Sequence, residues 1–142
     1  MRKRMVALIL CGVLTLTGNV QVFAADTTVD DATEISPRME NINYFNAYLQ
    51  INGSGNAEFN CNVRGYSGTT TRIEISAKLQ KYVDGSWVTL KTFTKGTDSY
   101  SVSLNDSYKV SKGYTYRIRA TVHAYSNSSS ETRTVLSNEV KY

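Results

Sequence analysis

The sequence predicts an all-β fold: an antiparallel sandwich of about seven strands in two sheets. Apolar and polar residues alternate with a period of two over most of residues 42–142, as in strands with one buried and one solvated face. Short segments of turn residues separate the alternating runs, and ten tyrosines against one proline favour β-structure. Strands with one apolar face must pack against a second layer, so we expect a sandwich rather than a small barrel.

The first three predicted strands span residues 45–51, 57–64 and 72–79. Apolar residues recur at every second position in each of them and define the face that we expect in the core. These inward residues are Phe45, Ala47, Leu49 and Ile51, then Ala57, Phe59, Cys61 and Val63, then Ile73, Ile75, Ala77 and Leu79. Glycine-containing segments at 52–55 and 65–68 separate the strands, which indicates turns.

Four more strands are expected over residues 87–93, 100–104, 114–124 and 132–141. The first of them follows Asp84 and Gly85, which predict a tight hairpin because both residues tolerate positive φ. The run over 114–124 is the longest in the chain, and it directs Arg117, Arg119 and His123 away from the apolar face. No segment of the domain has the 3.6-residue period of a helix.

The first 24 residues have the three parts of a secretory signal peptide. Arg2–Arg4 carry the positive charges, Val6–Leu14 form the apolar segment, and Ala24 is a suitable residue before the cleavage site. The apolar run is too short to cross a bilayer, so we expect cleavage after Ala24, secretion, and no membrane span in the mature form. Residues 25–41 are acidic and poor in apolar residues, which predicts a flexible tail before a domain over 42–142.

Three segments resemble fibronectin type III and immunoglobulin-like sandwiches. Lys112–Ala120 is similar to their sixth strand, Leu79–Trp87 to the hairpin after the third strand, and Ser137–Val140 to the closing strand. The resemblance implies a tyrosine corner made by Tyr114 or Tyr116.

The chain departs from these families at Cys61, where fibronectin domains have tryptophan, and it has no immunoglobulin cysteine pair. With its leader and acidic tail, it is similar to a family of short secreted bacterial proteins of unknown function. That likeness implies a fold and an extracellular location, and it implies no activity.

The residues give little support for an enzyme. Cys61 and the single histidine, His123, fall on opposite strand faces, so they cannot form a nucleophile–base pair. One histidine and one mature cysteine do not make a zinc site, and Glu58 and Glu74 fall on solvated faces rather than in one cleft. We therefore expect no catalytic activity, no metal and no cofactor. Without Arg2–Arg4 the chain has 13 basic and 12 acidic residues, which excludes a general affinity for nucleic acid.

Two surface features indicate a binding role. Arg117 and Arg119 form a basic stripe, joined by Arg72 or Lys78 from a neighbouring strand, and several tyrosines fall at outward positions or turns. The proposed contact residues are Tyr48, Tyr82, Arg117, Arg119 and Tyr125. A merely solvated face and simple β-propensity are the competing explanations of these two features.

We therefore expect a secreted, non-catalytic interaction module for an extracellular protein or a cell-envelope glycan. A secreted antagonistic peptide, similar to a bacteriocin or toxin, and a structural matrix protein are the alternatives. The sequence does not choose among the three.

Overall fold

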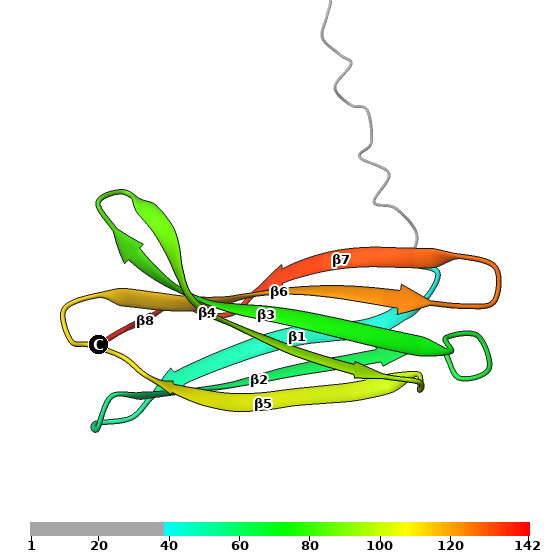
Figure 1. Ribbon diagram of the computed structural model, residues 1–142, viewed down its shortest axis with the longest axis horizontal. Helices are drawn as coiled ribbons and strands as arrows, with labels where there is room; N and C mark the ends of the chain where they lie inside the picture. The colour runs from blue at the N-terminus through cyan, green and yellow to red at the C-terminus, as the bar shows by residue number, and fades with distance from the viewer. Residues whose placement is uncertain (1–38) are drawn as a thin grey trace, which may run out of the picture. The chain divides into compact units, whose positions relative to one another are not determined.

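The computed structural model describes residues 39–142, which form two antiparallel β-sheets that face each other (Figure 1). The eight strands are β1 (Ile42–Ile51), β2 (Asn56–Gly65), β3 (Arg72–Val83), β4 (Ser86–Thr97), β5 (Ser101–Lys109), β6 (Thr115–Tyr125), β7 (Ser130–Leu136) and β8 (Val140–Lys141). The predicted all-β antiparallel sandwich is confirmed. The predicted signal peptide and the tail as far as Arg38 lie outside the described residues. Within residues 39–142 no helix is long and apolar enough to cross a membrane.

The two sheets have three and five strands. The three-strand sheet has the order β1-β2-β5, and the five-strand sheet has the order β4-β3-β6-β7 with β8 paired to β6. Their facing sides enclose one core, which contains the predicted inward residues of β2 and β3 and the residues of β6 that alternate with Arg117, Arg119 and His123. Alternation alone therefore assigned the buried face of these three strands correctly, because each of them has one side in the core and one side in solvent.

The predicted hairpin joins β3 to β4. Asp84 and Gly85 have φ values of 48° and 84°, the pair of positive angles that a two-residue hairpin turn of this type requires. The turn places Val83 opposite Ser86 and Tyr82 opposite Trp87. Figure 1 shows the tip of this hairpin bending away from the rest of the sheet.

The single strand predicted over residues 132–141 is wrong, because β7 ends at Leu136 and β8 begins at Val140. The first two residues of the gap bond to different strands, Ser137 to β6 and Asn138 to β1. Ser137 accepts a hydrogen bond at Oγ from the N–H of Ile118 (2.8 Å) and donates its own N–H to the Ile118 carbonyl (2.9 Å). The Asn138 amide accepts from the N–H of Leu49 (3.0 Å) and donates to the Leu49 carbonyl (2.8 Å), and so links the end of β7 to β1.

The tyrosine corner is formed by Tyr116. Its side chain is 0% exposed, and its hydroxyl donates to the carbonyl of Ser111 at 2.6 Å. Tyr114, the other candidate, is 37% exposed and packs edge-on against the Tyr116 ring. Tyr114 lies one residue before β6, and Lys81 Nζ lies 4.2 Å from the centroid of its ring.

Glu131 on β7 fastens the start of β1. Its Oε2 accepts from the backbone N–H groups of Glu40 (3.1 Å), Asn41 (2.8 Å) and Ile42 (3.1 Å), and its Oε1 accepts from Arg133 Nε (2.7 Å). Burial alone would raise the pKa of this carboxyl, but the N–H donors and Arg133 outweigh it and hold the pKa below its usual value. Asn41, the last residue of the predicted tail, is buried with the domain.

Cys61 lies in the core between the sheets and is fully buried. Burial raises the pKa of its thiol to about 11, so little thiolate is present at neutral pH.

We expect iodoacetamide to label Cys61 slowly in the folded protein and rapidly in urea. Mass spectrometry of the peptide that contains Cys61 measures the extent of labelling. Cys61→Ser should lower the free energy of unfolding by roughly 2 kcal/mol, because the hydroxyl finds no apolar match in the core. Equal labelling in both states would contradict the burial.

Candidate functional site

The outer face of the five-strand sheet carries a group of cationic and aromatic side chains beside the β3–β4 hairpin. The strand register places Lys78 directly opposite Arg119, Gln80 opposite Arg117, and Tyr82 opposite Trp87. We call Lys78, Tyr82, Trp87, Arg117 and Arg119 the cationic aromatic patch. Three strands contribute to it, since β3 supplies two residues, β4 one and β6 two.

Arg117 is the centre of the cationic aromatic patch. Its guanidinium carbon lies 4.0 Å from the centroid of the Trp87 ring, and its Nε donates to Gln80 Oε1 at 3.0 Å. Gln80 is itself buried under these side chains and donates to Thr89 Oγ1 at 3.4 Å. The Tyr82 ring completes the cluster, with its centroid 5.1 Å from that of Trp87. Stacking and hydrogen bonding together fix the orientation of the guanidinium.

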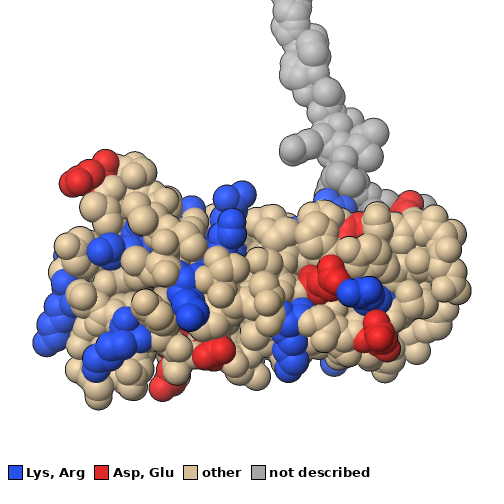
Figure 2. Space-filling view, in the orientation of Figure 1, with Lys and Arg blue, Asp and Glu red and all other residues tan. Residues whose placement is uncertain are grey.

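No ion pair within the described domain balances the charge of the cationic aromatic patch. Lys78 and Arg119 are both exposed and lie opposite each other across β3 and β6. Three ion pairs are formed within residues 39–142, and none of them includes Lys78, Arg117 or Arg119. In the view of Figure 2, basic side chains predominate toward the end of the domain that carries the β3–β4 hairpin. Such a face attracts anions, most strongly at low ionic strength.

The structure brings together three of the five predicted contact residues, namely Tyr82, Arg117 and Arg119. Tyr125 lies on the same sheet face but at the far end of β6, where its hydroxyl donates to Glu74 Oε2 at 3.3 Å. Its ring is half-buried, with the Arg72 guanidinium 5.9 Å from the centroid, so Tyr125 is a packing residue. Tyr48 is 53% exposed on the outer face of the three-strand sheet, on the opposite side of the sandwich.

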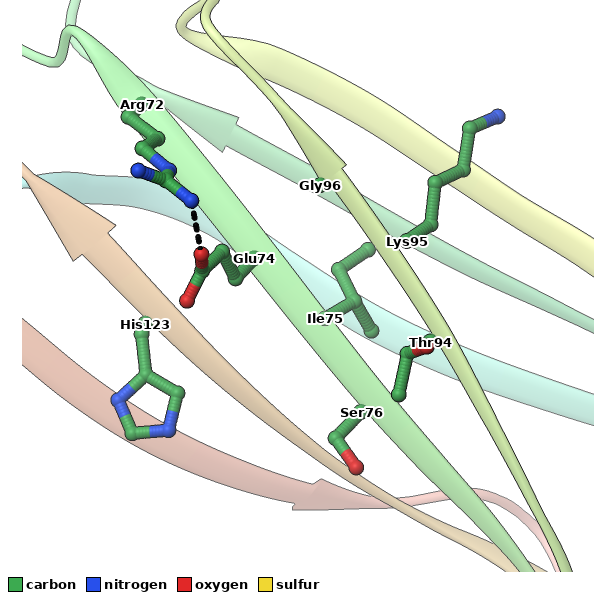
Figure 3. Close-up of a pocket in the computed structure, with 8 residues that line it drawn as sticks. All are labelled: Arg72, Glu74, Ile75, Ser76, Thr94, Lys95, Gly96 and His123. Atoms are coloured by element: carbon green, nitrogen blue, oxygen red, sulfur yellow. Dashed lines mark hydrogen bonds and ion pairs between the residues drawn. The ribbon is translucent and has the colours of Figure 1, made fainter.

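A hollow of about 450 Å³ lies on the outer face of the five-strand sheet, near Tyr125. It opens where Gly96, the cross-strand partner of Glu74, has no side chain (Figure 3). Arg72 and Glu74 point toward each other and form an ion pair at 2.5 Å. His123 on the next strand is hydrogen bonded through Nδ1 to Thr132 at 2.8 Å. Lys95, which also lines the hollow, donates to the Ser103 carbonyl at 2.7 Å. The charged side chains of this hollow are thus already paired with protein atoms, which makes it a weaker candidate than the cationic aromatic patch.

The predicted separation of Cys61 from His123 is confirmed. Cys61 is in the core, whereas His123 lies on the outer face of β6. No three His, Cys, Asp or Glu side chains of the described part of the chain are grouped closely enough to hold a metal ion.

Trp87 is the residue of the cationic aromatic patch that sequence reasoning missed. Local sequence places it in a strand and indicates no role in binding. The signal was nevertheless present, because a two-residue turn at Asp84 and Gly85 requires Tyr82 and Trp87 to face each other on one side of the hairpin. The position of Arg117 over that ring depends on the β3–β6 register, which local sequence does not define.

No protein-family model matches the chain, and no curated protein is significantly similar to it in sequence.

Proposed function

We propose that the protein is a non-catalytic binding module that acts outside the cell and holds an anionic glycan of the cell envelope on its cationic aromatic patch. The observation that carries this proposal is the opposed pair Lys78 and Arg119, which has no acidic partner among residues 39–142, beside the stacked Trp87 and Arg117.

The electrostatics of the patch favour an anionic partner. Like charges directly opposite each other in a sheet are destabilising, so the Lys78–Arg119 pair costs the fold a small amount of stability. An anion placed between the two side chains removes that repulsion. The neighbouring rings of Trp87 and Tyr82 offer stiff amphipathic contact area of the kind that sugars and proteins use. A flat sheet face fits an extended polymer better than a small molecule, which needs a concave pocket.

The extracellular location rests on the predicted signal peptide and on the expected cleavage after Ala24. The resemblance to fibronectin type III-like domains is supported by the two facing antiparallel sheets and by the hydroxyl bond of Tyr116 to Ser111. This resemblance concerns the fold alone. The function has to be argued from the surface residues, since sandwiches of this kind serve many roles.

The proposal is tested by replacing both opposed cations, Lys78→Ala together with Arg119→Ala. The free energy of unfolding should stay unchanged or rise slightly, because repulsion is removed and no ion pair is lost. Adhesion of the purified protein to intact producer and neighbouring cells should fall about tenfold, and its remaining dependence on salt should become weaker.

Tyr66→Ala is the matched control, because Tyr66 is an exposed residue in the turn after β2 and lies outside the cationic aromatic patch. Its adhesion should equal that of the unchanged protein. Unchanged adhesion of the double variant, in a protein that melts normally, would overturn the proposal.

A further inference from the structure

The outer face of the three-strand sheet differs in chemistry from the cationic aromatic patch. Its outward residues form four rows across β1, β2 and β5, which we call the amide face. The rows are Tyr44, Arg64 and Ser101; Asn46, Asn62 and Ser103; Tyr48, Asn60 and Asn105; and Gln50, Glu58 and Ser107. Its charged residues lie at the two ends: Arg64 in the first row, Glu58 in the last, and Lys109 one row beyond Glu58, opposite Asn56, so the two central rows are uncharged.

The amides at the centre are ordered by a chain of hydrogen bonds that crosses the strands. Ser103 Oγ donates to Asn62 Oδ1 at 2.6 Å, Asn62 Nδ2 donates to Asn60 Oδ1, and Asn60 Nδ2 donates to Asn105 Oδ1. Each amide group has two donors and two acceptor lone pairs, and this chain uses only part of them. The surface therefore presents donors and acceptors side by side in fixed orientations, which suits neighbouring hydroxyl groups that both donate and accept.

Two tyrosines flank these amides on β1. Tyr44 is 52% exposed and Tyr48 is 53% exposed, although both lie in a strand whose other face packs on the core. Each lines a shallow hollow. The hollow at Tyr44 measures about 180 Å³ and is also lined by Asn62, Arg64 and Ser103, and the hollow at Tyr48 measures about 150 Å³ and is also lined by Gln50, Glu58 and Asn60. Each hollow has room for one sugar ring. Four residues of strand separate the two tyrosines by about 13 Å, which leaves space for further rings over Asn46.

We propose that the amide face binds an uncharged glycan chain, lying along β1 with sugar rings against Tyr44 and Tyr48. The neutral centre of the amide face fits a ligand without charge, in contrast to the cationic aromatic patch on the other sheet. The dimensions argue against a protein partner. Three strands and four rows cover about 10 Å by about 20 Å between backbone positions, whereas a stable protein interface buries about 800 Å² on each partner. This site is separate from the cationic aromatic patch and does not depend on it.

The test uses the full secreted protein and three uncharged hexasaccharides: cellohexaose, chitohexaose and mannohexaose. Isothermal titration calorimetry should detect binding of at least one of them with a Kd of about 1 mM or tighter. Tyr44→Ala and Tyr48→Ala should each weaken that binding about tenfold, whereas Tyr48→Phe, which keeps the ring, should retain most of it. Asn60→Asp, which introduces a charge and removes the donor to Asn105, should weaken it as well.

The double variant Lys78→Ala with Arg119→Ala is the control, and it should bind the hexasaccharide like the unchanged protein. The proposal is overturned if no hexasaccharide binds at about 10 mM, or if Tyr44→Ala and Tyr48→Ala bind as tightly as the unchanged protein while melting normally. It is also overturned if the control variant loses the sugar, because the sugar would then occupy the five-strand sheet. Adhesion through the cationic aromatic patch is measured separately, so either proposal can fail alone.

Discussion

Tyr116→Ala is expected to lower the free energy of unfolding by about 4 kcal/mol, as the loss of a fully buried large aromatic side chain does. The ring is 0% exposed in the core, and its hydroxyl binds the carbonyl of Ser111 at 2.6 Å. Removal of the side chain therefore opens a cavity and leaves that carbonyl without its partner. Urea unfolding followed by tryptophan fluorescence measures the effect, since Trp87 is the only tryptophan of the chain.

Two further variants separate the ring from the hydroxyl and from its neighbour. Tyr116→Phe should cost about 1 kcal/mol, because it removes only the hydrogen bond to Ser111. Tyr114→Ala should cost much less than Tyr116→Ala, since Tyr114 is partly exposed and contacts chiefly the edge of the Tyr116 ring and Lys81. If Tyr114→Ala is as damaging as Tyr116→Ala, Tyr116 alone is not the corner of this sandwich.

Glu131→Gln is expected to lower the free energy of unfolding by about 2 kcal/mol at pH 7, because an amide is a weaker acceptor for three backbone N–H groups than a carboxylate. It also brings an NH₂ group to Arg133, a residue that donates to Glu131. The N–H groups of Asn41 and Ile42 would then be partly buried with a poorer partner. Equilibrium urea unfolding at pH 7 measures the loss.

The effect of Glu131→Gln should depend on pH in one direction. The pKa of the Glu131 carboxyl in the folded protein lies below its ordinary value of 4.5. The stabilisation that the carboxylate gives to the fold is therefore complete above the unfolded-state pKa, and it is lost as the pH falls through the folded-state pKa. The difference between the unchanged protein and Glu131→Gln should therefore shrink from about pH 6 to about pH 3. Glu139→Gln, a change at an exposed glutamate, is the control, and it should remove none of this dependence. A constant difference across the range would show that the carboxylate charge does not hold the start of β1.

Local sequence predicted most of the fold because the central strands β2, β3 and β6 each have one face in the core. The alternation in β2 and β6 identified their buried residues, and Asp84 with Gly85 identified the hairpin. It did not predict the break between β7 and β8. There Ser137 still bonds to Ile118 of β6, whereas the Asn138 side chain bonds to Leu49 of β1 in the other sheet, a contact that local sequence does not indicate.

The candidate sites were harder to predict from the sequence, because they depend on pairing between strands that are far apart along the chain. Outward positions of Tyr82, Arg117 and Arg119 followed from parity, yet the meeting of Arg117 with Trp87 required the β3–β4 and β3–β6 registers together. The amide face was missed for the same reason. Asn60 and Asn105 are 45 residues apart, and they become neighbours only when β5 pairs with β2.

The bonds of Asn138 to Leu49 have a consequence for how the molecules behave together in solution. β1 is an outer strand of the three-strand sheet, so the N–H and C=O groups on its free side are a template to which another chain could add. At Leu49 both of these groups are already bound to the Asn138 amide. A strand from a second molecule would have to displace that amide before pairing across this position. Asn138 thus protects the free edge of β1 against sheet extension between molecules.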